Sequence, residues 1–159
     1  MAAGGPRVGR GWPRRAPGND WICDDLRVRY YSIDDANDRL TDVRMLLEQL
    51  RADRDSVALL QQDQQLRAAT NGSADHASEV AAGAARVRTL VARMRDTVIR
   101  LDVWDVTLRD IGTGLIDFPA LASGRPIWLC WRLGEPDTIG WWHELDTGYD
   151  SRQPLAELT

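Results

Sequence analysis

Two long stretches of the chain repeat apolar residues every three or four positions, which is the spacing of one face of an α-helix. The first predicts a helix from Ser32, its N-cap, to about Ala69, because the Ser32 hydroxyl can accept a free backbone N–H. The second predicts a helix to about Leu108 that starts at Asp75, as its cap, or at Ser78. The apolar positions are Ala36, Leu40, Val43, Leu47, Leu50 and Val57, then Val80, Ala84, Val87, Val91, Met94, Val98 and Leu101.

The two predicted helices are joined by residues 70–73, whose sequence Thr-Asn-Gly-Ser is typical of a turn. Helices of similar length with a short connection predict an antiparallel hairpin. Folding the chain about residue 72 places Leu50 opposite Met94, and it brings Arg39 near Asp105 as a candidate ion pair. The same folding sets the polar run 61–65 opposite the small residues 81–85, so we expect a close helix–helix approach there.

The chain after the second helix has the alternation of β-structure. Gly112 and Gly114 are expected to close that helix, since glycine readily adopts the left-handed conformation at a helix end. Three strands are predicted over residues 115–118, 127–132 and 138–144, separated by turns at 123–126 and 134–137. Residues 27–31 are predicted to form either a short strand or an extended segment that leads into the first helix.

Hairpin geometry sets the expected register of the last two strands. A tight turn at residues 134–137 pairs Cys130 with Trp141, Trp128 with His143, and Leu129 with Trp142. Cys130 and His143 then share one face, and both faces are rich in apolar residues. A sheet of this kind must be covered, so we expect one face to pack on the helices and the other to meet the tail, a second subunit or a ligand.

The predicted fold is therefore α+β: a long antiparallel two-helix hairpin followed by a small three-stranded antiparallel sheet. Residues 1–20 are expected to be a disordered tail, residues 21–111 the hairpin, and residues 112–159 a tryptophan-rich β meander packed on it as one folded unit. The amphipathic helices are typical of a coiled coil, and dimerisation into a four-helix arrangement would cover their remaining apolar surface.

Composition narrows the function classes. The net charge of −4 argues against broad binding to nucleic acid or to a membrane surface, and the chain has no apolar run long enough to span a bilayer. Five of the seven tryptophans follow residue 100 and could stack on bases, but the residues around them are acidic. Two cysteines make no disulfide framework, and no secretory signal is visible, so we expect a cytoplasmic protein.

The C-terminal third carries segments that resemble a known family. They are Asp117-Phe118-Pro119, Cys130-Trp131-Arg132, Gly134-Glu135, Trp142-His143-Glu144, Gly148 and Arg152-Gln153-Pro154. Together with the helix opening after Tyr31, this pattern resembles the small bacterial family catalogued as domain of unknown function 2203, over about residues 30–155. That family has no established activity, so the resemblance supports the fold and singles out residues without implying a reaction. The first 20 residues lie outside the shared pattern.

A soft thiolate and an imidazole are zinc-type ligands, which makes Cys130 and His143 candidate metal ligands, although both also fit packed core residues. Arg132 and Arg152 can clamp a carboxylate or phosphate, or can fix a terminal loop by pairing with an acidic residue such as Asp117 or Glu144. Asp117 can also cap the turn that follows it. The candidate cluster comprises Asp117, Arg132, Glu135, His143, Glu144 and Arg152.

From these residues the sequence predicts a non-enzymatic interaction or assembly protein that self-associates through the hairpin and needs no cofactor. The alternative is a small-ligand binder or enzyme with Arg132, Glu135, His143 and Glu144 around a pocket in the sheet. A third possibility is a metal-binding regulator that uses Cys130 and His143. The sequence contains no phosphate-binding loop, dinucleotide fingerprint, zinc-protease motif or Cys-x-x-Cys pair.

Overall fold

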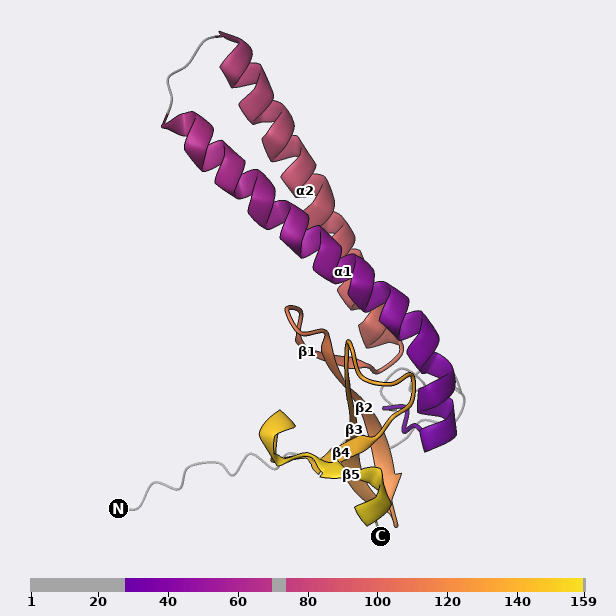
Figure 1. The fold of residues 1–159 in the computed structure, drawn as a ribbon. Helices are drawn as coiled ribbons and strands as arrows, with labels where there is room; N and C mark the ends of the chain where they lie inside the picture. The colour runs from indigo at the N-terminus through magenta and orange to yellow at the C-terminus, as the bar shows by residue number, and fades with distance from the viewer. Residues whose placement is uncertain (1–27, 70–73, 159) are drawn as a thin grey trace, which may run out of the picture.

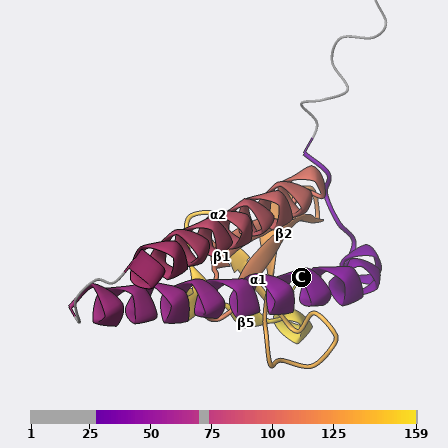
Figure 2. The same cartoon turned by 90° about the horizontal axis from the view of Figure 1, so that it is seen from above.

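The computed structural model describes residues 28–69 and 74–158, and the predicted tail over residues 1–20 lies outside them. Two helices, α1 (Ile33–Ala68) and α2 (Ala74–Val103), form a hairpin whose lower end rests on an antiparallel sheet (Figures 1 and 2). The predicted α+β class is confirmed, but the sheet has five strands rather than three. Their order is sequential: β1 (Thr107–Asp110), β2 (Leu115–Ala122), β3 (Arg125–Arg132), β4 (Trp141–Glu144) and β5 (Gln153–Pro154).

Helix α1 begins where the sequence predicts. The backbone N–H of Asp35 donates to the Ser32 hydroxyl at 3.1 Å, and the carboxylate of Asp35 accepts from the Ser32 backbone N–H. This reciprocal capping box satisfies two N–H groups that the first turn would otherwise leave open. Just before it, Tyr31 donates its backbone N–H to Pro119 at 2.7 Å and forms a single parallel bridge to β2.

Helix α2 ends earlier than predicted, at Val103 instead of near Leu108. Asp105 takes a left-handed conformation (φ 55°), and the Val106 N–H donates back to Leu101 at 3.0 Å while the Asp105 N–H donates to Asp102 at 2.9 Å. This pair of bonds is a Schellman closure. The expectation that Gly112 and Gly114 end the helix is therefore wrong, because both lie in the turn between β1 and β2.

The beginning of α2 and the hairpin pairing also differ in detail from the prediction. Helix α2 starts at Ala74, so Asp75 lies within its first turn rather than capping it. Contacts between Asp53 and Arg93, and between Arg67 and Glu79, place each α1 residue opposite a position two residues further along α2 than the simple folding predicts. The predicted turn at residues 70–73 lies outside the described residues.

The predicted ion pair between Arg39 and Asp105 is replaced by other contacts. Arg39 forms an ion pair with Asp42 and stacks over the ring of Trp104, whereas Asp105 accepts the backbone N–H of Arg29 at 2.9 Å. The chain leaving α2 and the chain entering α1 are thus joined at this end of the hairpin.

The predicted register of β3 and β4 is confirmed: Cys130 pairs with Trp141, Leu129 with Trp142, and Trp128 with His143. Strand β4 begins at Trp141 rather than at residue 138, because Ile139 turns its N–H toward Asn37 on α1, at 2.7 Å, and not toward a strand. Strand β2 continues to Ala122, four residues beyond the prediction, and turns into β3 through Ser123 and Gly124, both with positive φ. That is the usual two-residue hairpin turn.

One face of the sheet packs against α1 and completes the core, as expected. The buried cluster combines helix residues with alternate strand residues: Ala36, Leu40, Val43, Leu47, Leu101, Ile116, Phe118, Ala120, Ile127, Leu129, Trp131 and Trp142. Because strand side chains alternate, the intervening residues point to the opposite, outer face. No helix within residues 28–69 and 74–158 is long and apolar enough to cross a membrane.

Candidate functional site

The outer face of the sheet brings three buried polar side chains together. Asp117 on β2 pairs directly with Cys130 on β3, and His143 on β4 is the diagonal neighbour of Cys130. All three residues are at most 3% exposed, and one potential ligand atom from each lies within 4.8 Å of the others. Three adjacent strands therefore place a carboxylate, a thiol and an imidazole at one point. Asp117 sits in the middle of β2, so the prediction that it caps a turn is wrong.

Hydrogen bonds fix the orientation of the imidazole. His143 Nδ1 lies 2.8 Å from the backbone carbonyl of Glu144, and Nε2 lies 3.2 Å from Asp117 Oδ2. A carbonyl oxygen can only accept, so Nδ1 carries the proton in that bond.

The carboxylate of Asp117 has two unlike oxygens. Arg109, on β1, donates from Nε to Oδ2 at 2.7 Å and stacks its guanidinium over the ring of Trp128. Oδ1 has no hydrogen-bond partner among the residues that the structure describes. A buried carboxylate oxygen without a partner is costly, which makes it a candidate to bind something else.

Cys130 is a buried thiol that forms no disulfide with any described residue. Burial, together with the negative charge of Asp117, raises the pKa of the Cys130 thiol to about 12, while the guanidinium of Arg152 acts in the opposite direction. Thiolates are the nucleophilic form of cysteine. The environment of Cys130 therefore does not suit a cysteine nucleophile acting alone at neutral pH.

A cavity of about 190 Å³ opens beside these three side chains. The segment between β4 and β5 forms its other wall. The remaining lining residues are Arg109, Leu115, Leu145, Thr147, Gly148 and Tyr149. A space of this size holds several water molecules or a small ligand.

The other predicted site residues lie around this cavity or apart from it. Arg152 donates to Glu135 at 2.5 Å, and Glu135 also accepts the backbone N–H of Arg132 at 3.1 Å. The guanidinium of Arg152 stacks over the rings of Trp141 and Tyr149. Arg152 thus fixes the C-terminal segment, as one sequence interpretation suggested, but its partner is Glu135 rather than Asp117 or Glu144.

Glu144 does not join the cluster. Its side chain pairs with Arg125, the first residue of β3. The four residues of the alternative pocket, Arg132, Glu135, His143 and Glu144, do not line this cavity together: of these four, only His143 does.

Sequence reasoning missed two residues of the site, Arg109 and Tyr149. Arg109 comes directly after the end of the predicted second helix, which was too long. The prediction therefore did not place Arg109 on a strand together with Thr107. Tyr149 lies in a short 3₁₀ turn, η2 (Tyr149–Ser151), which no periodic pattern marks. The apolar–polar alternation from Val106 to Arg109 was the available signal for β1.

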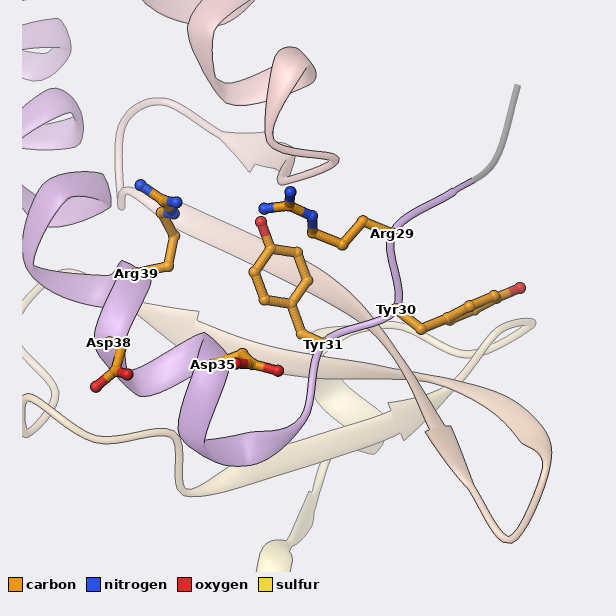
Figure 3. A pocket seen from close by; sticks show the side chains of 6 residues that line it. All are labelled: Arg29, Tyr30, Tyr31, Asp35, Asp38 and Arg39. Atoms are coloured by element: carbon orange, nitrogen blue, oxygen red, sulfur yellow. The ribbon is translucent and has the colours of Figure 1, made fainter. Parts of the chain in front are cut away.

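A larger cavity, of about 450 Å³, lies where the chain enters α1. Figure 3 shows the guanidinium of Arg29 beside the hydroxyl end of Tyr31, whereas Tyr30 points away. Two of the polar groups there already have partners: the Tyr31 hydroxyl donates to the Trp104 carbonyl at 2.5 Å, and Asp35 belongs to the capping box. These groups stabilise the start of α1, so the smaller cavity on the sheet is the better candidate site.

Comparison with known proteins gives a single family. A family model described as "Uncharacterized conserved protein (DUF2203)" matches residues 29–155, which include both helices and all five strands. No curated protein and no solved structure matches the chain significantly.

Proposed function

Because this chain belongs to the DUF2203 family of uncharacterized conserved proteins, whose description names no activity, we propose a function from its own surface. We propose that the protein is a non-enzymatic assembly protein whose helical hairpin pairs with a second copy of the chain.

An exposed apolar stripe on α1 carries this proposal. Met45, Ala52, Leu59 and Leu66 follow one another at intervals of seven residues, and all four are exposed. The large members are 62%, 67% and 65% exposed, although Met and Leu are among the residues most often buried. A seven-residue interval keeps side chains on one line along a helix that supercoils with a partner.

The end of the hairpin farther from the sheet has little covering of its own. Buried positions on α1 stop at Asp53, although the helix continues to Ala68. Figures 1 and 2 show α1 and α2 extending beyond the sheet, with no other described element beside them. Two helices alone bury only one seam, so a partner on the stripe would supply the missing layer.

The stripe favours a second copy in antiparallel orientation. A two-fold axis between Ala52 and Leu59 would place each Ala52 against the partner copy's Leu59, and each Met45 against the partner copy's Leu66. The small side chain of Ala52 then packs against the large side chain of Leu59 in each of the two contact layers next to the axis. A parallel pair would set Ala52 against Ala52 and leave a gap.

Charges of both signs along the outer end of the hairpin also suit self-association. Asp63 and Glu79 lie close to Arg67, with which both form ion pairs. A mixed surface of this kind does not repel its own copy, unlike a surface of one sign.

The reducing cytoplasm is the compartment we propose, since Cys130 is a free thiol.

The test is the molar mass of the purified chain in solution, measured by sedimentation equilibrium over a range of concentrations. We expect a dimer for the wild type and a monomer for the double variant Leu59→Glu, Leu66→Glu, because each interface would then bury four added carboxylates. The matched control is Ala58→Glu, Gln65→Glu, which adds the same charge at the same spacing but turned by about 100° around the helix.

The control variant is expected to remain dimeric. A wild type that stays monomeric at every concentration contradicts the proposal. So does a double variant that dimerises as well as the control. Circular dichroism of each variant at equal concentration shows whether the helices are intact.

A further inference from the structure

We propose that Asp117, Cys130 and His143 form a binding site for a zinc-type divalent cation, with the cavity beside them at the open coordination position. This site lies on the outer face of the sheet and is independent of the hairpin assembly. The proposal depends on the orientation of the imidazole, on the unpartnered carboxylate oxygen and on the chemistry of the three donors.

The orientation of His143 is the first argument. Because Nδ1 donates its N–H to the Glu144 carbonyl, Nε2 is the ring nitrogen that faces the cluster, 3.2 Å from Asp117 Oδ2. Metal-binding histidines commonly show this arrangement, in which the second ring nitrogen donates to a backbone carbonyl and fixes the tautomer.

The second argument is the free oxygen of Asp117. Arg109 occupies Oδ2, while Oδ1 is buried and has no partner in the described part of the chain. Cation binding through Oδ1 would remove the cost of that unpaired acceptor. The bond from Arg109 would then orient the carboxylate, as outer-shell partners of metal ligands do.

The donor set and its spacing fit a borderline-soft metal ion. Sulfur, imidazole nitrogen and carboxylate oxygen are the three ligand types that zinc takes in proteins. Ligand atoms bound to a tetrahedral zinc ion lie about 3.3–3.8 Å apart. The three donors here lie within 4.8 Å of one another, so the side chains need to close by only about 1 Å.

Three protein ligands leave one position of a tetrahedron for another group. That position would open on the cavity of about 190 Å³, which Thr147 and Tyr149 also line. A site with three ligands and an accessible fourth position resembles reactive zinc centres more than closed structural ones. A water molecule or a small anion is the expected fourth ligand.

The charges at the site suit a divalent ion that carries an anionic fourth ligand. A bound thiolate and carboxylate supply two negative charges, Arg109 adds one positive charge through its ion pair with Asp117, and Arg152 is neutralised by Glu135. The competing arrangement is a protonated His143 that forms an ion pair with Asp117 in place of a metal. The two differ in one observable: only the metal site places sulfur on a cation.

Cobalt(II) distinguishes them, because it occupies zinc sites and gives a strong sulfur-to-cobalt absorption band when a thiolate binds. The full chain is freed of metal with a chelator and titrated with Co²⁺. We expect the band to saturate at one ion per chain and to disappear on adding Zn²⁺. A titration of the wild type without this band overturns the proposal.

Matched variants locate the site, since the chain holds only two cysteines and two histidines. Cys130→Ser should abolish the band and weaken Zn²⁺ binding by at least about 100-fold, beyond the 10–100-fold typical of outer-shell changes. Cys23→Ser and His76→Gln should leave both unchanged. A band that survives in Cys130→Ser, or that is lost in Cys23→Ser, contradicts the assignment, and circular dichroism verifies that each variant is folded.

Discussion

A single acidic residue, Asp53, lies buried in the seam between the two helices. Arg93 on α2 donates to both of its oxygens, from Nε at 2.7 Å to Oδ2 and from a terminal nitrogen to Oδ1, and Gln49 donates to Oδ1 at 2.8 Å. The hydrogen bonds from Arg93 hold the pKa of Asp53 below its usual range. The carboxylate is therefore stabilised as an anion inside the hairpin.

We predict that Asp53→Asn lowers the free energy of unfolding by about 2–3 kcal/mol at pH 7. This value lies toward the lower end of the cost of breaking a buried ion pair, because the Arg93 side chain is half exposed. The folded pKa of Asp53 lies below the unfolded value of about 3.9. The pair thus stabilises the fold above that pH, and its contribution is lost as the pH falls through the folded value. Urea unfolding at pH 7 and at pH 3 measures both effects.

Asp55→Asn is the control for this prediction. Asp55 is exposed, and its ion pair with Arg54 is loose, with 3.9 Å between the nitrogen and the carboxylate oxygen. It should change stability by less than about 0.5 kcal/mol. Equal effects of the two substitutions, or a difference between wild type and Asp53→Asn that does not shrink in acid, would show that the buried pair is not the cause.

Single residues also show how far the sequence can predict the site. The register of β3 and β4 follows from the tight turn between them, so the shared face of Cys130 and His143 was predictable. Asp53 was not, because an apolar pattern treats a charged residue as solvent-facing, and only its partner 40 residues away shows otherwise. Arg109 was missed for a different reason: the predicted second helix ran to about Leu108, over the first half of the strand that holds Arg109.

At the scale of elements, the end of α2 shows why the second helix was predicted to be too long. The sequence signal for closing a helix is usually glycine, and Gly112 and Gly114 were the nearest candidates. The structure uses Asp105 in the left-handed conformation instead. Aspartate tolerates that conformation better than most residues, and its carboxylate accepts the Arg29 N–H, a contact between ends of the hairpin that the local sequence does not reveal.

The middle of the hairpin gives a prediction for α2. Gly83 lies inside the helix, where glycine costs about 1 kcal/mol relative to alanine. An added Cβ would come within 2.8 Å of Gln64 Nε2, which is the flexible end of a side chain and has no partner in the described residues. The amide can therefore move aside, and we expect Gly83→Ala to raise the unfolding free energy by about 0.5 kcal/mol in thermal unfolding.

Ala85→Gly is the matched reverse change on the exposed side of the same helix. It should lower stability by about 1 kcal/mol, which is the intrinsic difference between the two residues. If Gly83→Ala destabilises the chain while Ala85→Gly behaves as expected, then the Gln64 side chain is held in place and the space beside it requires glycine at position 83.

At the scale of the whole molecule, the meander and the hairpin share one core. The helices and the central strands were predictable because each buries a periodic face. The two edge strands were not: β5 has two residues, and β1 has four with only its first two partly buried. They exist because β2 and β4 offer them backbone partners, so tertiary contacts rather than local pattern determine them.

A shared core predicts that hairpin and sheet unfold together. Leu47 on α1 is fully buried in the cluster that contains Phe118, Leu129 and Trp131 of the sheet. Leu47→Ala should lower the unfolding free energy by about 3 kcal/mol. It should also shift helical circular dichroism and tryptophan fluorescence to the same new midpoint, because helix and strands lose one common contact set.

Val103→Ala, at an exposed position, should change stability by less than about 0.5 kcal/mol. If fluorescence keeps the wild-type midpoint while the helical signal falls, the sheet folds without α1, and the outer-face site would then be formed by the meander alone.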